Sequence, residues 1–191
     1  MSLWAHFFSL YFIYQEIPIF TKNGFIEIAG VILLVLCLLR CTQYAVQSRV
    51  KKGRCFWLAS ILVFFAVIRR ELNHLPDLFI SSDFLLLGYA YDWWEDRVLL
   101  VIHLITAGLL IYSWRYFWAV LKRTPIWLYL IVAVLALLQY MGENAIMFPE
   151  TFGMMLEELA EGMTYGVALA YLWTFNLADF ERRVIGISVG K

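Results

Sequence analysis

The sequence predicts an all-α integral membrane protein. Three observations lead to this fold class: the composition, five apolar segments of membrane-spanning length, and an uneven distribution of basic residues between the loops. Of the 191 residues, 63% are hydrophobic and 16% are charged, whereas a soluble domain is closer to half apolar and a quarter charged. The apolar segments should be helices, because a lone strand would leave its backbone unpaired in lipid.

Five segments reach the length that a membrane-spanning helix needs, which is about 20 residues. They cover residues 25–46, 55–74, 97–121, 125–148 and 154–175. Residues 1–24 are hydrophobic and aromatic but contain Glu16 and Pro18, so we expect this segment either to lie in the interface or to form a sixth span. Residues 75–96 form an acidic and aromatic loop. The chain, 1–191, is then a single transmembrane helical domain.

The basic residues lie in alternate loops, and this pattern predicts the orientation of the chain. One set of loops contains Arg40, Arg49, Lys51, Lys52, Arg54, Arg115, Lys122, Arg123, Arg182, Arg183 and Lys191. The positive-inside rule places this set in the cytoplasm and the 75–96 loop outside it. We therefore predict a protein of the bacterial inner membrane with a cytoplasmic C-terminus. Nucleic-acid binding is not expected, because the basic residues are few and lie at helix ends.

Ionisable and polar residues recur inside the predicted spans at one depth. Because the spans alternate in direction, each of them contributes at least one such group near the outer face, and we call this set the polar layer. Its members are Glu27, Glu71, His74, His103, Glu143, Asn144, Glu157, Glu158 and Glu161. A charged residue at the centre of a span costs about 2.5–3.5 kcal/mol on insertion, whereas an apolar residue gains about 0.3–0.6. The layer therefore needs protons, water, a cation, or Arg69 and Arg70 to satisfy it.

The spacing of these residues allows several of them to converge. Glu71 and His74 are three residues apart and share a helical face, as do Glu158 and Glu161, whose face Tyr165 extends. A small-x-x-x-small motif runs from residue 162 to 166 and predicts a close approach of another helix.

The leading hypothesis from this pattern is a divalent metal site that faces outward. Carboxylates with one or two imidazoles suit Mn, Fe or Zn, and Glu71-x-x-His74 has the spacing found in four-helix di-metal carboxylate sites. The expected ligands are Glu71, His74, His103, Glu143, Glu158 and Glu161. The residues expected to balance charge or support these ligands are Arg69, Arg70, Glu27, Asn144, Glu157 and Tyr165. Metal-activated water acting on a lipid-like substrate would be the chemistry of such a site.

Two other readings remain open at this point. The protein could be a non-enzymatic membrane subunit whose polar layer serves helix packing, partner docking, or proton or solute relay, with other membrane subunits or a second copy as partners. Alternatively, His74 and His103 could be the two axial ligands of a haem. The sequence does not decide whether the protein is an enzyme.

In plan, these acids and histidines within a helical bundle resemble the multipass metal-dependent lipid hydrolases of the ceramidase and progestin-receptor type. Those proteins have seven spans and a histidine-rich metal site. This chain lacks that residue pattern, so the resemblance assigns no role to any residue.

Overall fold

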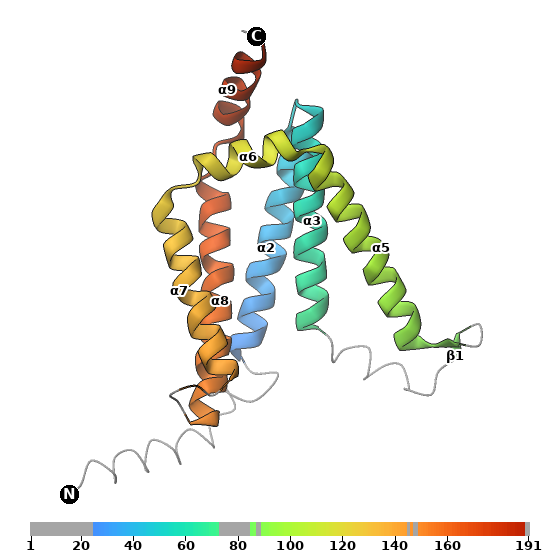
Figure 1. Cartoon of the computed structure of the whole chain (residues 1–191), viewed down its shortest axis with the longest axis vertical. Coiled ribbons are helices and arrows are strands. Elements are labelled where there is room, and N and C mark those ends of the chain that lie inside the picture. The colour runs from blue at the N-terminus through green and yellow to red at the C-terminus, as the bar shows by residue number, and fades with distance from the viewer. Residues whose placement is uncertain (1–24, 73–84, 87–88, 145, 147–148, 190–191) are drawn as a thin grey trace, which may run out of the picture.

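The computed structural model describes residues 25–72, 85–86, 89–144, 146 and 149–189 (Figure 1). This part of the chain is helical apart from a two-stranded hairpin, which confirms the all-α prediction. The helices are α2 (Phe25–Gln47), α3 (Lys51–Glu71), α5 (Tyr91–Tyr112), α6 (Trp114–Arg123), α7 (Ile126–Glu143), α8 (Glu150–Thr174) and α9 (Leu177–Val189). The hairpin pairs β1 (Leu85–Leu86) with β2 (Tyr89–Ala90) in antiparallel fashion.

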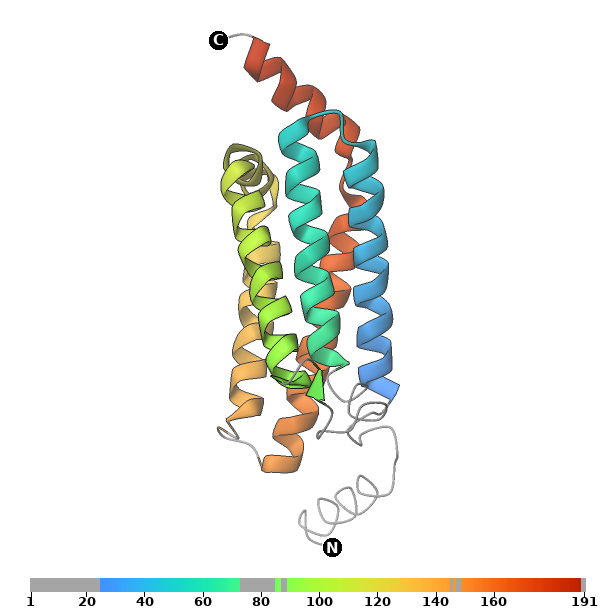
Figure 2. The same ribbon diagram turned by 90° about the vertical axis from the view of Figure 1, so that its right-hand side faces the viewer.

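The long helices form a row in which each packs on the next. The order is α7, α8, α2, α3 and α5, and it differs from the order along the chain (Figure 1). Figure 2 shows α2, α3 and α5 running alongside one another. The short helix α6 crosses one end of the row, and α9 extends from that same end. We call this end of the row the α6 end. The opposite end, where polar side chains of α3, α7 and α8 meet, is called the cluster end.

Two described helices are long and apolar enough to cross a membrane. They are α2, over Ile28–Gln47, and α7, over Ile126–Glu143. The pair α5 and α6 would be a third if it were one broken span, but the two helices meet at an angle of 78°. Two to three candidate spans support a membrane protein, whereas five are not shown. The difference arises because α3 ends in Arg69 and Arg70 and α8 carries several glutamates, and charges of this kind interrupt an apolar run.

The bend between α5 and α6 corrects the prediction of one continuous span over residues 97–121. Helix α6 is amphipathic: Tyr116 and Val120 are buried, whereas Arg115 and Lys122 are exposed. A helix with that pattern gains by lying across the end of the row, where its apolar side contacts protein and its basic side reaches water. Helix α5 also begins at Tyr91, within the segment that the sequence predicted to be a loop.

Large apolar side chains are exposed along the outer faces of α2, α5 and α7. They include Ile28, Ile32, Leu39, Val98, Val101, Leu104, Ile105, Ile126, Leu130, Val134 and Leu137. Exposed apolar surface of this extent marks contact with a membrane or another protein. A lipid environment therefore explains why so many apolar residues lie on the outside.

An aromatic core packs the helices together at the α6 end. The rings of Tyr44 and Trp57 lie 4.7 Å apart between centroids, and Phe175 packs edge-on against Trp57 at 5.6 Å. The hydroxyl of Tyr44 lies 2.6 Å from the carbonyl oxygens of both Leu172 and Phe175. It therefore supplies a hydrogen-bond partner where the last carbonyls of α8 lack one within the helix. This core joins α2, α3 and α8.

The cluster end is held by a contact between two glycines. A Cβ atom on Gly142 would lie 2.5 Å from the carbonyl oxygen of Gly153 and 2.9 Å from the backbone nitrogen of Glu157. A Cβ on Gly162 or Gly166 would meet no described atom within 4 Å. The close helix approach therefore falls at Gly142 and Gly153, and the prediction that it would involve residues 162–166 is wrong for the described part of the chain.

We expect the Gly142→Ala substitution to destabilise the protein, because the new methyl group would force α7 and α8 apart. Overpacking of this kind costs about 1–3 kcal/mol. The matched control is Gly108→Ala, where no described atom lies within 4 Å of the new Cβ and alanine should stabilise the helix by about 1 kcal/mol. Thermal unfolding in detergent should lower the melting temperature for the first variant and not for the second. Equal melting temperatures would contradict the close contact.

Candidate functional site

Three helices contribute polar side chains to one group at the cluster end. Arg70 and Glu71 end α3, Glu161 and Tyr165 lie one turn apart on α8, and Gln139 comes from the last turns of α7. We call these five residues the polar cluster. Glu71 and Glu161 come from different helices, and both belong to the predicted polar layer.

The guanidinium group of Arg70 joins the two acids. Its Nη2 atom donates to Glu71 Oε1 at 2.8 Å and also to Glu161 Oε1. The amide of Gln139 donates to Glu161 Oε1 from 3.5 Å. The carboxylates are mostly buried, with 15% of the Glu71 side chain and 18% of the Glu161 side chain exposed, whereas 62% of Arg70 is exposed. The acids are therefore inside the bundle, and the arginine reaches them from its edge.

Tyr165 lies between the same two carboxylates. Its hydroxyl is 3.0 Å from Glu71 Oε1 and 2.8 Å from Glu161 Oε1. A hydroxyl has one hydrogen and donates to one acceptor at a time. The hydroxyl therefore links the two acids by donating to one of them at a time. Two carboxylates face one guanidinium, which leaves one excess negative charge in the cluster.

Arg69 makes a separate ion pair. It contacts the carboxylate of Glu95 on α5, and about a fifth of each side chain is exposed. This pair joins α3 to α5. Consecutive arginines on α3 thus contact two different helices: Arg69 contacts an acid of α5, and Arg70 contacts an acid of α8.

The other predicted site residues lie around the cluster or away from it. Glu157, half-buried on α8, lies close enough to Glu143 and Glu161 for their like charges to act on it. Glu143 itself is exposed at the end of α7, and Glu158 is half-buried on α8. The side-chain amide of Asn144 donates to the carbonyl oxygen of Tyr140 at 2.9 Å, which caps its own helix.

Of the two predicted histidine ligands, only His103 falls within the described residues. His103 is exposed on α5, with Nδ1 2.7 Å from the carbonyl oxygen of Leu99 on the same helix. His74 lies outside the described residues, as does the side chain of Glu27. Within the described part of the chain, no group of three or more histidine, cysteine or acidic residues is placed to hold a metal ion. The metal and haem hypotheses stay predictions.

A further buried carboxylate, which the sequence analysis missed, lies at the α6 end. Glu181 on α9 is 5% exposed. Its Oε1 atom accepts a hydrogen bond from Ser48 Oγ at 2.5 Å and from the Tyr116 hydroxyl at 3.4 Å, and Oε2 accepts one from the backbone N–H of Arg49 at 3.0 Å. This carboxylate therefore joins α9 to the α2–α3 turn and to α6.

The surroundings of Glu181 explain why it is accommodated. A Cβ on Gly53 would lie 2.5 Å from Ser48 Oγ and 2.9 Å from Glu181 Oε1, so glycine leaves the necessary space. Burial raises the pKa of the Tyr116 hydroxyl, and the neighbouring Glu181 carboxylate raises it further, so the hydroxyl remains a donor. The signal in the sequence was an acid placed directly before Arg182 and Arg183, in a segment that the orientation argument treated as basic.

The comparisons with known proteins give no guide to function. No protein family, curated protein or solved structure matches the chain. The functional argument therefore depends on the polar cluster and its surroundings.

We expect the Tyr165→Phe substitution to lower stability by about 2 kcal/mol, which is typical for loss of a hydrogen bond to a charged group. The control is Tyr140→Phe on α7, because the Tyr140 side chain is 57% exposed and its hydroxyl makes no hydrogen bond within the described residues. Thermal unfolding in detergent should separate the two variants. Equal melting temperatures would show that the Tyr165 hydroxyl does not hold the acids together.

Proposed function

We propose that this is a bacterial inner-membrane protein in which α2, α3, α5, α7 and α8 all cross the bilayer. The row itself supports this proposal. Helices α8, α2 and α3 pack successively between α7 and α5, so a bilayer that contains α2 and α7 would also surround their neighbours. The charged residues of α3 fall in its first and last turns, where long side chains reach the interface. The basic residues of α6 and α9 favour the cytoplasm for the α6 end.

We infer that the polar cluster serves a non-enzymatic role: it fixes the packing of α3 against the row. The observation that carries this inference is that Arg70 and Tyr165 each contact the carboxylates of both Glu71 and Glu161. The two carboxylates are therefore linked to each other by hydrogen-bond donors that they share. Two carboxylates face one guanidinium, so the cluster keeps one excess negative charge in a mostly buried site.

The same excess charge supports metal binding as a second candidate. Glu71 and Glu161 would be ligands, and His74 follows Glu71 by three residues in the sequence. Arg70 would have to leave the acids before a divalent cation could bind, because the guanidinium occupies the position between them. In that case the site would use metal-activated water on a lipid-like substrate.

Thermal unfolding in detergent tests the packing role. Arg70→Gln should lower the melting temperature, because it leaves two mostly buried carboxylates without the guanidinium that joins them. The control is Glu143→Gln, which removes an exposed acid at the same end of the row and should leave the melting temperature unchanged. Equal melting temperatures of the two variants would overturn the proposal.

Metal analysis separates the two candidates. If the cluster serves helix packing alone, purified protein should contain far less than one Mn, Fe or Zn per chain, and a chelator should not change the melting temperature. Near-stoichiometric metal that is lost in Glu161→Gln but retained in Asp179→Asn, an acid at the α6 end, would establish the metal site instead. An absorption spectrum of the same sample reports on haem.

Cysteine labelling tests the placement in the bilayer. In a background where alanine replaces Cys37, Cys41 and Cys55, cysteines placed in turn at the two ends of the row should alternate in their access to a membrane-impermeant maleimide. Positions 96 and 144 should react in intact cells, whereas positions 51, 122 and 182 should react after the membrane is opened. Two successive positions on the same side would show that the helix between them does not cross.

A further inference from the structure

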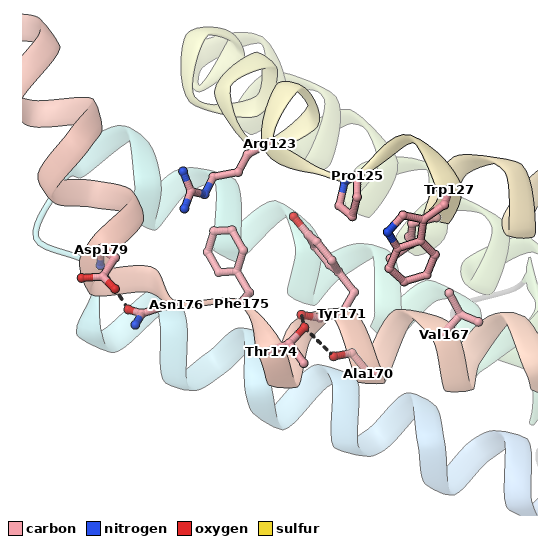
Figure 3. A pocket seen from close by; sticks show the side chains of 11 residues that line it. Arg123, Pro125, Trp127, Val167, Ala170, Tyr171, Thr174, Phe175, Asn176 and Asp179 are labelled. Carbon is pink, nitrogen blue, oxygen red and sulfur yellow. Dashed lines mark hydrogen bonds between the residues drawn. The ribbon is translucent and has the colours of Figure 1, made fainter.

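Helices α7 and α8 touch at the cluster end and diverge toward the α6 end (Figure 1). Where they diverge, a pocket of about 420 Å³ lies between the first turns of α7 and the last turns of α8 (Figure 3). Its apolar lining comes from Trp127 and Leu128 on one side and from Val167, Ala170, Tyr171 and Phe175 on the other. Its volume falls within the range of small-molecule sites, about 300–1,000 Å³.

Three hydrogen-bond donors of this pocket have no acceptor within the described residues. Arg123 is exposed and lines the pocket (Figure 3), and it makes no ion pair in the described part of the chain. The Tyr171 hydroxyl accepts a hydrogen bond from Thr124 Oγ1 at 2.9 Å, which leaves its own hydrogen available. The third donor is the indole N–H of Trp127. A ligand with anionic oxygen atoms would satisfy all three.

One acid also lines the pocket, and its charge is already compensated. Arg182 Nη2 lies 3.0 Å from Asp179 Oδ1, one turn away on α9. With Arg123 and Arg182 set against Asp179, the pocket and its rim keep one positive charge. Helix α6 adds Arg115 and Lys122 nearby and has no acid of its own, so the local field favours an anion.

The face of α8 beyond the pocket is open. Gly162 and Gly166 precede Ala170 at intervals of four residues, so the three lie in a row along the helix. A Cβ on either glycine would meet no described atom within 4 Å, so this track has room for an acyl chain. This line of small residues leads from the pocket toward the middle of the proposed bilayer.

We propose that this pocket binds one anionic phospholipid of the cytoplasmic leaflet, with the phosphate held by Arg123, Tyr171 and Trp127 and an acyl chain lying along α8. The inference rests on the bilayer placement proposed above, which puts the α6 end at the cytoplasmic surface. Anionic headgroups are concentrated there, and basic pockets between helices on that side recognise them. Tryptophan at the same depth is typical of the membrane interface.

Native mass spectrometry of the full chain in detergent, titrated with phosphatidylglycerol or phosphatidylcholine, tests this proposal. We expect one phosphatidylglycerol to bind more tightly than phosphatidylcholine, and Arg123→Gln to weaken it about fivefold, the effect of about 1 kcal/mol for one basic residue near a membrane surface. The matched control is Lys122→Gln, which removes the same charge from the neighbouring residue outside the pocket and should change binding less than twofold.

A second pair of variants blocks the pocket without changing its charge. Ala170→Trp should fill the space between α7 and α8 and weaken phosphatidylglycerol binding, whereas Ala107→Trp on the exposed face of α5 should not. Circular dichroism and size-exclusion chromatography check that each variant is folded. If Ala170→Trp does not fold, the comparison of Arg123→Gln with Lys122→Gln still decides the result.

Three outcomes would overturn the lipid site. They are equal losses in Arg123→Gln and Lys122→Gln, equal affinity for the two lipids, and displacement of the bound lipid by millimolar inorganic phosphate, which would indicate a site for the free anion. The bilayer placement fails separately: cysteine labelling can contradict it while Arg123→Gln still weakens lipid binding. Normal labelling with no effect of Arg123→Gln would reject the lipid site alone.

Discussion

The cost of holding carboxylates inside an apolar helical bundle governs the arrangement of this protein. Glu71 and Glu161 are each less than one fifth exposed, and buried acids persist when charged or hydrogen-bonding partners reach them. Arg70 and Tyr165 meet that requirement for both acids at once. They can do so because α3 ends and α8 begins at the same end of the row, which brings residues about 90 positions apart in the sequence within hydrogen-bonding distance.

The two ends of the row are held by different kinds of contact, and the difference shapes the space between α7 and α8. At the cluster end, the backbones of Gly142 and Gly153 approach without side chains between them. At the α6 end, Tyr171 and Trp127 stand between the same two helices and line a pocket. The two helices therefore lie in close contact at one end, and at the other end they are far enough apart to leave a pocket between them. The proposed lipid site is this pocket.

The sequence predicts the helical elements from their apolar length, and the alternating direction of successive long helices predicts a common end for the acids. It cannot predict which acids meet, because the arrangement of α8 next to α2 depends on packing between segments more than 100 residues apart. The bend near Ser113 was missed because residues 97–121 are apolar enough to suggest one span. Glu181 was missed because its partners, Ser48 and Tyr116, are distant in the sequence. The residue 162–166 motif has the spacing for close approach, but the neighbouring helix meets α8 at Gly153 instead.

The position of α2 bears on how the polar cluster can work. Helices α3 and α8 each pack on α2, which stands between them in the row, so the bridge from Arg70 to Glu161 runs past α2 and is not their main point of contact. Tyr44 and Trp57 already join α2, α3 and α8 at the other end. Removing Arg70 would therefore loosen α3 at the cluster end, while the aromatic core still holds the other end of α3 against α2 and α8. The cluster adds a direct link between two helices that each pack on α2, and the proposed packing role requires this link.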